Sequence, residues 1–443
     1  MRRIAASFAV ALSGALVSAC AGRTHPAALA PAGSRAALRP YADSLIADPM
    51  FRSANWGVLV VDPESGDTLY SRNAGKLFMP ASNEKLLTGA TALAQLGPRF
   101  RFVTRFATNG PQRDSTLDGD LIVVGRGDPT FSDSLRAGDY RNAFRDMADS
   151  VARRGIRRIR GSLRRAGRAF PDSTYGFGWQ VDDLRTPSGA VVDELFVNEG
   201  VLPGTRVRAN GDTVSAPAVI REPAAAFLEA FAAALAERHI ALDGAADART
   251  ALPDSGLLPM FELRSPPLSM ILARMAKPSQ NQIAEILFKT LALEKTGVGT
   301  ADSGRRVVER QLLDWGARAD GFAVRDGSGM SRHDYVTPET ILRVLDAMRK
   351  SPDFPVWYDA LPIAGVDGTI ASRMKGTSAE RNVHAKTGSL DKARSLSGYV
   401  TTADGRLLLF SFLCNNFTVP NREVERVQDA ILARLASSRA VSR

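Results

Sequence analysis

The sequence predicts an α/β (α+β) fold in which helices cover an antiparallel sheet and a large β-rich region is inserted into the chain. Three observations predict it. Strand-like runs form a hairpin near the beginning, a second hairpin and a helix lie near the end, and short strands with many turns fill the middle. The 443 residues are 44% apolar and 23% charged, which is typical of a globular protein. This composition excludes a disordered chain, and the length predicts two or three domains.

The first hairpin is predicted by two strand-like runs on either side of a turn. Residues 56–61 are apolar, residues 62–67 carry Asp, Pro, Glu, Ser and Gly, and a strand pattern resumes at 68–70. A helix is expected next, because apolar residues recur at helical spacing over 86–94 and a Gly-Pro pair at 97–98 ends the pattern.

The middle of the chain has a different texture. Short strand-like pieces alternate with Gly, Asp and Pro turns, and helical patches are expected near 140–154 and 223–242. The helical pattern of the first part then returns. We therefore expect residues 106–265 to form one or more inserted domains within a body made of residues 37–105 and 266–443.

The end of the chain predicts the second hairpin. Strands are expected at 396–402 and 406–414, joined by an Ala-Asp-Gly turn, and a last helix is expected at 422–437. Cys414 closes an apolar run and is expected to pack as a small buried side chain. With only one other cysteine in the chain, no disulfide framework is expected.

The beginning of the chain has the features of a targeting segment. Two arginines precede a stretch of apolar and small residues, so residues 1–19 are predicted to be a signal peptide, too short to be a confident membrane span. The tetrapeptide Val-Ser-Ala-Cys that ends at Cys20 resembles the lipobox of bacterial lipoproteins. That resemblance implies that a lipid is attached to the Cys20 thiol; ordinary secretion is the alternative. Residues 20–36 are rich in Ala, Gly, Pro and Ser and are predicted to be a linker.

The charge pattern is basic. The formal net charge is +10, with 57 Lys and Arg against 47 Asp and Glu. A positive surface suits an anionic membrane face or cell envelope as well as nucleic acid. No zinc-finger, RNA-binding or basic-helix pattern is present, so we expect no nucleic-acid partner.

Several catalytic chemistries lack their motifs. There is no His-Glu-x-x-His sequence and no cluster of Cys and His, so we expect no metal site. There is no Gly-x-Ser-x-Gly elbow, which weakens a Ser-His-Asp hydrolase. No phosphate-binding loop and no convincing dinucleotide fingerprint occur, so we expect no cofactor.

Serine and lysine, in contrast, recur in a pattern typical of nucleophilic catalysis. Ser-x-x-Lys occurs three times, starting at Ser82, Ser372 and Ser389. In the serine penicillin-recognising enzymes this motif is followed by Ser-x-Asn and then by Lys-Thr-Gly. Only Ser82 precedes the Ser-x-Asn motif at Ser279. Of the two Lys-Thr-Gly motifs, the one at Lys386 lies before the second hairpin, where it belongs.

The first motif has a physical rationale. At the start of a helix, Ser82 and Lys85 are three residues apart and share one face. The Lys85 amine can take a proton from Ser82 Oγ only when it is neutral, and burial together with a second cation, Lys386, would lower its pKa. The helix N-terminus also favours a developing oxyanion. The alternatives are that Ser82 is a plain helix cap and Lys85 a solvated helix lysine.

The other two motifs also have structural alternatives. Residues 279–282, Ser-Gln-Asn-Gln, have the form of a helix capping box, in which Ser279 caps the helix and Asn281 is an ordinary first-turn residue. The Lys-Thr-Gly sequence at Lys386 is equally compatible with a strand end followed by a turn.

Longer segments around these motifs resemble a known family. They are Pro80-Ala-Ser-Asn-Glu-Lys-Leu-Leu-Thr88, Gly127-Asp-Pro-Thr130, Asp326-Gly-Ser-Gly-Met-Ser-Arg332, Leu361-Pro-Ile-Ala-Gly-Val-Asp-Gly-Thr369 and Ser395-Leu-Ser-Gly-Tyr-Val400. The chain resembles the D-alanyl-D-alanine carboxypeptidase/endopeptidases, the low-molecular-mass class C penicillin-binding proteins. The resemblance covers residues 40–435 and implies a serine β-lactamase/transpeptidase-like fold. The long gap between Ser82 and Ser279 fits the large inserted domains of that family.

The resemblance also implies roles for individual residues. It makes Ser82 the nucleophile and Lys85 its general base, with an oxyanion hole formed by backbone N–H groups of Ser82 and Ser389. It makes Ser279 a proton relay to the leaving amine, and it makes Asn281 the residue that orients Lys85 and the substrate amide. The substrate's terminal carboxylate would be held by Lys386 and Thr387, and Gly388 and Ser389 would also contact the substrate.

The implied function is a serine D-Ala-D-Ala carboxypeptidase/endopeptidase acting on peptidoglycan stem peptides. β-Lactam antibiotics would be covalent inhibitors, and the enzyme would lie in the cell envelope or periplasm, held to the membrane only by a lipid anchor. Three alternatives share parts of this pattern: a β-lactamase, a non-catalytic peptidoglycan-binding lipoprotein and a structural envelope protein.

Overall fold

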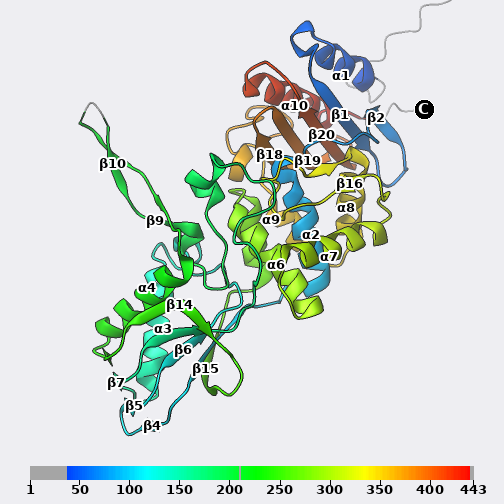
Figure 1. Cartoon of the computed structure of the whole chain (residues 1–443). Coiled ribbons are helices and arrows are strands. Elements are labelled where there is room, and N and C mark those ends of the chain that lie inside the picture. The colour runs from blue at the N-terminus through cyan, green and yellow to red at the C-terminus, as the bar shows by residue number, and fades with distance from the viewer. Residues whose placement is uncertain (1–36, 209–210, 440–443) are drawn as a thin grey trace, which may run out of the picture.

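The structure, a computed structural model, describes residues 37–208 and 211–439. The predicted signal peptide, the linker and Cys20 lie outside these residues. Two five-stranded sheets, each with its own helices, occupy different ends of the molecule (Figure 1). The α/β fold with an antiparallel sheet flanked by helices is confirmed. Within the described ranges, no helix combines the length and the apolar character needed to cross a bilayer.

The larger part is built on a five-stranded sheet in the order β18-β19-β20-β1-β2, with every neighbouring pair antiparallel. Its strands are β1 (Asn55–Val61), β2 (Thr68–Arg72), β18 (His384–Leu390), β19 (Ala393–Thr401) and β20 (Leu407–Asn415). Both predicted hairpins are confirmed, and β1 joins them by pairing with β20, where Val58 faces Phe412. Cys414 is fully buried in β20, as expected.

Strand β18 carries the Lys-Thr-Gly triplet, for which the sequence offered a strand end followed by a turn as an alternative. It lies at the sheet edge, and Lys386, Thr387 and Gly388 form its middle. The alternative of a strand followed by a turn is right about both elements, but the strand continues past the triplet to Leu390 before the turn begins.

Helices cover both faces of this sheet. Two of them, α1 (Leu38–Ile46) and α10 (Asn421–Ala436), share a core with Val58 and Val60. The neighbouring residue Leu59 points to the other face, as alternation along a strand requires. The helices in the core of that second face are α2 (Glu84–Leu96), α5 (Leu268–Ala276), α6 (Asn281–Thr296), α7 (Ala301–Asp314), α8 (Pro338–Lys350) and α9 (Phe354–Ala360).

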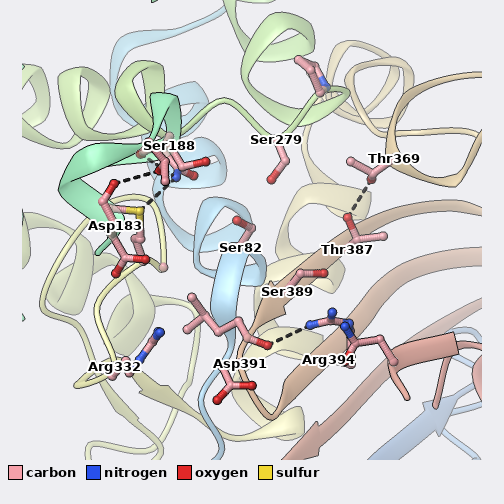
Figure 2. Close-up of a pocket in the computed structure, with 17 residues that line it drawn as sticks. Ser82, Asp183, Ser188, Ser279, Arg332, Thr369, Thr387, Ser389, Asp391 and Arg394 are labelled. Atoms are coloured by element: carbon pink, nitrogen blue, oxygen red, sulfur yellow. Dashed lines mark hydrogen bonds between the residues drawn. The ribbon is translucent and has the colours of Figure 1, made fainter. Parts of the chain in front are cut away.

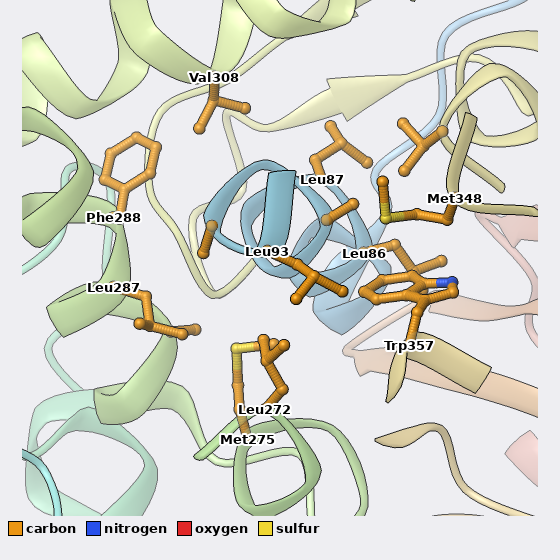
Figure 3. Packing of buried hydrophobic residues seen from close by; sticks show 14 of the residues in the cluster. Leu86, Leu87, Leu93, Leu272, Met275, Leu287, Phe288, Val308, Met348 and Trp357 are labelled. Carbon is orange, nitrogen blue, oxygen red and sulfur yellow. The ribbon is translucent and has the colours of Figure 1, made fainter. Parts of the chain in front are cut away.

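Helix α2 runs through the middle of this helical layer. Figure 3 shows Leu86, Leu87 and Leu93 of α2 surrounded by side chains of neighbouring helices, among them Met275 and Trp357. The first ten residues of α2 are all buried, polar ones included. A helix buried on every side is held rigidly by packing, which fixes the position of the turn that precedes it.

The second sheet lies in the part of the chain between 103 and 264. Its order is β14-β8-β6-β3-β15, and it mixes parallel and antiparallel pairs. Its strands are β3 (Val103–Thr108), β6 (Leu121–Val124), β8 (Leu163–Ala166), β14 (Ala246–Leu252) and β15 (Leu258–Arg264). A smaller sheet of short strands accompanies it, in the order β13 (Ala241–Leu242), β7 (Arg158–Ile159), β5 (Thr116–Leu117), β4 (Gln112–Arg113).

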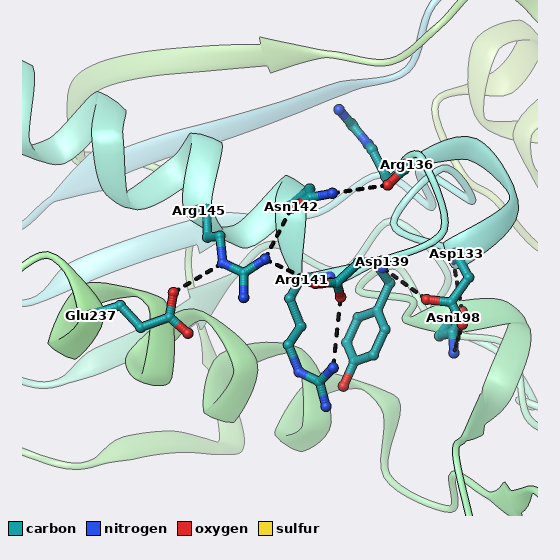
Figure 4. A network of polar contacts seen from close by, with 9 residues as sticks. Asp133, Arg136, Asp139, Arg141, Asn142, Arg145, Asn198 and Glu237 are labelled. Atoms are coloured by element: carbon teal, nitrogen blue, oxygen red, sulfur yellow. Dashed lines mark hydrogen bonds and ion pairs between the residues drawn. The ribbon is translucent and has the colours of Figure 1, made fainter.

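Two helices pack on this second sheet: α3 (Arg141–Arg153) and α4 (Pro223–Glu237). Polar contacts join the two helices. Figure 4 shows Arg145 of α3 donating to Glu237, the last residue of α4, and to Asp139 and Asn142 near the start of α3. The expected helix at 223–242 is too long, because the chain turns at His239, which has a φ of 56°. The residues after it form strand β13 instead.

Candidate active site

Ser82 lies in a short 3₁₀ turn, Ala81–Asn83, that leads directly into α2. Two hydrogen bonds tie this turn to the sheet: Asn83 Nδ2 donates to the Lys386 carbonyl at 2.8 Å, and Ser395 Oγ donates to the Pro80 carbonyl at 2.6 Å. Ala81 has a φ of 49°, a backbone conformation that L-residues rarely adopt and that clusters at functional sites. The alternative reading of Ser82 as a helix cap is wrong, because no side chain caps α2.

Lys85 projects from the first turn of α2 and is 1% exposed, so the alternative of a solvated helix lysine is also wrong. Its Nζ donates to Ser82 Oγ at 2.9 Å, to Asn281 Oδ1 at 2.6 Å and to the Ser328 carbonyl at 2.7 Å. Burial lowers the pKa of Lys85 to about 8, against the opposing effect of nearby carboxylates, chiefly Asp326. A neutral amine next to the hydroxyl is therefore accessible near neutral pH.

Lys386 reaches the same site from strand β18. Its Nζ donates to Ser279 Oγ at 2.8 Å and to the Thr387 carbonyl at 2.9 Å. The side chain is fully buried, and burial together with the nearby Lys85 cation lowers its pKa well below the usual value. Ser279, which was a candidate helix cap, is not one. It has a φ of 65°, and the side chain of Gln280 caps α6 by accepting from the Ile283 N–H.

Asn281 is the first residue of α6, and its two amide atoms have different partners. Oδ1 accepts from Lys85, while Nδ2 donates to the Ser188 carbonyl at 3.0 Å and contacts Met330 Sδ at 3.3 Å. The adjacent Gln282 is buried and donates from Nε2 to the same Ser188 carbonyl. Ser188 belongs to a segment of the inserted region, residues 172–190, which we call the arm.

The rest of the Lys-Thr-Gly-Ser segment lines the open side of the site. Thr387 Oγ1 donates to Thr369 Oγ1 at 2.7 Å. Gly388 passes close to the Ser82 turn, where a Cβ atom would lie 2.4 Å from the Pro80 carbonyl oxygen and 2.0 Å from Ser395 Oγ. Only glycine allows this approach of the strand to the turn.

These residues surround a cavity of about 540 Å³ (Figure 2). Its lining comprises Ser82, Asp183, Thr186, Ser188, Pro278, Ser279, Asn281, Gly329, Met330, Arg332, Thr369, Thr387, Ser389, Leu390, Asp391, Arg394 and Asn421. Of the predicted site residues, Lys85 and Lys386 lie behind this surface and reach it through their hydroxyl partners. Gly388 lines an adjoining cavity of about 320 Å³.

The other two Ser-x-x-Lys motifs lack a comparable arrangement. In the motif that begins at Ser389, the lysine, Lys392, is 53% exposed and pairs with Asp391. In the motif that begins at Ser372, the lysine, Lys375, is exposed to solvent. Neither amine has the burial that brings Lys85 toward neutrality.

Sequence reasoning missed several residues that line the cavity. Arg332 and Thr369 lie in segments that carry the family resemblance, so a signal existed, but no role was assigned to either. Arg394 faces Ser389 across the strand pair. Asp183 and Ser188 of the arm belong to no sequence motif. The arm contributes backbone carbonyls as well as side chains, and since every residue type has a backbone carbonyl, that contribution leaves no mark in the sequence.

Four buried carboxyl groups, those of Glu84, Glu285, Asp326 and Asp334, lie near Lys85. Burial raises the pKa of Glu84, Glu285 and Asp334, with the nearby Asp326 adding to each rise, and for Glu285 the value reaches about 8. Asp326 accepts from the N–H groups of Ser328, Gly329 and Ser331. The turn that supplies the Ser328 carbonyl to Lys85 is therefore held from below by backbone hydrogen bonds.

Comparison with known proteins agrees with this geometry. The profile of the D-Ala-D-Ala carboxypeptidase 3 (S13) family matches residues 38–218 and 209–438. The chain is 32% identical over 466 residues to the D-alanyl-D-alanine carboxypeptidase of Actinomadura sp. (strain R39), covering 90% of this chain and 84% of that protein.

Solved structures show the same fold. Penicillin binding protein 4 from Haemophilus influenzae is similar with a TM-score of 0.77 and 23% identity, covering 89% of this chain and 99% of that one. The same protein complexed with a β-lactam is similar with a TM-score of 0.68 and 25% identity, covering 88% and 97%. The chain therefore belongs to the D-Ala-D-Ala carboxypeptidase 3 (S13) family of serine peptidases.

Proposed function

We propose that this chain hydrolyses D-Ala-D-Ala or cross-link peptide bonds of peptidoglycan stem peptides through an acyl-enzyme on Ser82. The observation that carries the proposal is the 2.9 Å contact between a buried, pKa-lowered lysine amine and a serine hydroxyl at a cavity wall. A protein that only binds peptidoglycan has no need of such an amine, because its burial costs free energy that binding alone does not require.

Acylation begins with proton transfer from Ser82 to the neutral amine of Lys85. Oγ attacks the carbonyl carbon, and the negative charge on the carbonyl oxygen is stabilised by backbone N–H groups of Ser82 and Ser389. The C–N bond then breaks. Ser279 relays to the leaving nitrogen the proton that Lys85 took, so that the amine departs neutral.

Lys386 and Asn281 prepare these transfers. Asn281 Oδ1 accepts from Lys85 Nζ and so orients the amine. Because Lys386 Nζ donates to Ser279 Oγ, the Ser279 O–H proton is free to point toward the leaving nitrogen. A substrate carboxylate near Thr387 would raise the lowered pKa of Lys386 and so be bound by a cation.

In the second half of the reaction, water adds to the ester carbon, the bond to Oγ breaks, and the water's proton ends on Ser82.

The relatives support the substrate class. One is named a D-alanyl-D-alanine carboxypeptidase, and the related penicillin binding protein 4 has been solved with a β-lactam. A β-lactam ring offers an amide carbonyl that the same nucleophile attacks. We therefore propose that β-lactams acylate Ser82 and inhibit the enzyme.

A fluorescent penicillin tests the nucleophile. The wild-type chain is expected to be labelled covalently, and Ser82→Ala to be unlabelled. Ser372→Ala and Ser389→Ala, which change the other two Ser-x-x-Lys motifs, are the matched controls and are expected to be labelled. Labelling of Ser82→Ala would exclude Ser82 as the acylated residue.

Two measurements separate the alternatives. Mass analysis of muropeptides should show loss of D-alanine or cleavage of cross-links, whereas a non-catalytic envelope protein leaves them intact. Fast, repeated turnover of a chromogenic cephalosporin would instead favour a β-lactamase, because that enzyme class deacylates rapidly.

We also propose an exported location and a domain division. The Arg-rich start, the apolar stretch and the lipobox resemblance support a signal peptide at 1–19 and lipid attachment at Cys20. Radiolabelled palmitate should enter the wild-type chain but not Cys20→Ala. The second sheet, whose strands lie between Val103 and Arg264, supports an inserted unit near the predicted range 106–265 within a catalytic body of 37–105 and 266–443; strand β3 begins three residues before that range.

A further inference from the structure

Three oxygens surround the Lys85 amine, and two of them belong to groups that do not react. They are Asn281 Oδ1 and the Ser328 carbonyl oxygen, while the third is Ser82 Oγ. A neutral amine has two N–H donors and one lone pair. When it donates to the first two oxygens, its lone pair points at Ser82, as a general base requires. The placement of these two oxygens therefore sets the direction of proton transfer.

The arm determines the orientation of the first oxygen. Asn281 Nδ2 donates to the Ser188 carbonyl, so a flipped amide would place oxygen against oxygen there and N–H against N–H at Lys85. Gln282 keeps the carbonyl in place. Its buried Nε2 lies 3.1 Å from the Pro187 carbonyl oxygen, 3.0 Å from that of Ser188 and 3.2 Å from that of Ala190.

The arm also holds the turn that supplies the second oxygen. Trp179 Nε1 donates to Asp326 Oδ2 at 2.8 Å. The same carboxylate binds the backbone of the turn, including the Ser328 N–H through Oδ1 at 3.1 Å. Asp326 is fully buried, so the indole N–H supplies a partner that water does not replace.

The start of the arm is fixed to the helices below it. Asp172 accepts from the buried Lys289 Nζ of α6 at 2.6 Å through one oxygen, and from the Ala301 N–H at the beginning of α7 at 2.6 Å through the other. Contacts along its whole length thus hold the arm against the catalytic body: near the start at Asp172, in the middle at Trp179 and near the end at Ser188.

We propose that the arm positions the general base. Trp179 of the arm acts through Ser328, and Gln282 of α6, which binds the arm, acts through Asn281. Both interactions aim the Lys85 lone pair at Ser82. The inference rests on the proposed function, in which Lys85 activates Ser82. It assigns a role in acylation to a segment of the inserted region, over and above lining the cavity. Neither Trp179 nor Gln282 lines that cavity.

The test uses the full chain and two variants. Each variant removes a hydrogen bond that helps to fix one of the two oxygens, the Ser328 carbonyl oxygen or Asn281 Oδ1. Trp179→Phe keeps an aromatic ring and removes the donor to Asp326, and Gln282→Met keeps the volume and removes the donors to the arm carbonyls. Stopped-flow acylation by a fluorescent penicillin separates the dissociation constant of the non-covalent complex from the acylation rate constant. We expect the rate constant to fall by roughly ten- to hundredfold, as small misplacements of catalytic groups do, and the dissociation constant to change by no more than about twofold.

A matched control lies on the same arm. Phe177 is 61% exposed and packs beside His333, so Phe177→Leu is expected to acylate at the wild-type rate. Wild-type rate constants in both Trp179→Phe and Gln282→Met, or a loss that appears entirely in the dissociation constant, would overturn the inference while leaving the proposed function intact. A wild-type chain that takes no label would overturn the proposed function and the inference together.

Discussion

The catalytic body and the arm contribute to one cavity in different ways. The body supplies reactive side chains: the hydroxyls of Ser82 and Ser279 and the amines of Lys85 and Lys386. The arm supplies a backbone carbonyl, that of Ser188, and a donor to a buried carboxylate. Short motifs mark the first group in the sequence, and none marks the second.

The two kinds of contribution are encoded differently in the sequence. Reactive side chains are restricted to a few residue types, so they recur as recognisable motifs. A backbone carbonyl is offered by every residue, so the sequence at Ser188 says little about it. Four experiments test this contrast between the two regions.

The largest effect is expected at the amine of the body. Lys85→Met keeps a long buried side chain and removes the base, so acylation by penicillin should slow by about 10²–10⁴-fold. Lys392→Met, in the third Ser-x-x-Lys motif, is the matched control and should label normally. If both variants were acylated at the same rate, the reactive side chains of the body would not include Lys85.

A substitution in the core of the inserted region should affect stability instead of chemistry. Phe227 of α4 is fully buried and packs on Phe131 and Phe144, with ring centroids 5.1 Å and 4.9 Å apart. Phe227→Ala should lower the free energy of unfolding by about 3–5 kcal/mol, measured by urea denaturation. The folded fraction should keep the wild-type acylation rate constant. A slower folded enzyme would show that the inserted core and the site are coupled.

The pH dependence of acylation follows from the pKa of Lys85, which is about 8. The base must be neutral, and the protonated amine dominates below that pKa, so kcat/KM should fall about tenfold for each pH unit below 8. The groups that set this value are the carboxyls of Glu84, Glu285, Asp326 and Asp334, which raise it against the effect of burial. A rate independent of pH between 6 and 8 would contradict this assignment.

The smallest effect is expected at the surface. Arg310 and Asp314 form an ion pair at 3.1 Å on α7, with side chains 75% and 49% exposed. Arg310→Gln should change the free energy of unfolding by less than about 0.5 kcal/mol, since solvent screens such pairs. Thermal denaturation of this variant provides the baseline against which Phe227→Ala is compared.

Much of the fold could be predicted because its elements have local signals. Apolar runs beside polar turns predict both hairpins, and helical spacing ended by a Gly-Pro pair predicts α2. The three motifs, taken in order, select Ser82, Ser279 and Lys386 from several candidates. The structure brings Ser82 and Ser279 to the wall of one cavity, with Lys386 behind it and bonded to Ser279.

The remaining features depend on contacts that one sequence does not display. Ser279 and Gln280 both have side chains able to cap α6, and only the backbone at Ser279 decides in favour of Gln280. The sequence around Lys386 is compatible with a strand end, but it does not show that the strand continues to Leu390 and forms the sheet edge. The arm lies far along the chain from the motifs it touches, and its links to Asp326 and Gln282 depend on tertiary packing.

The pairing of β1 with β20 has a consequence for biosynthesis. Val58 and its partner Phe412 lie 354 residues apart in the sequence (412 − 58). Such long-range closure is slow, and it cannot begin until the ribosome has made the chain as far as β20. Strand β18, with Lys386, joins the sheet only through β19 and β20. A chain that stops before β20 therefore lacks the strand that links Lys386 to the first hairpin, and the full set of site residues comes together only after β20 has been made.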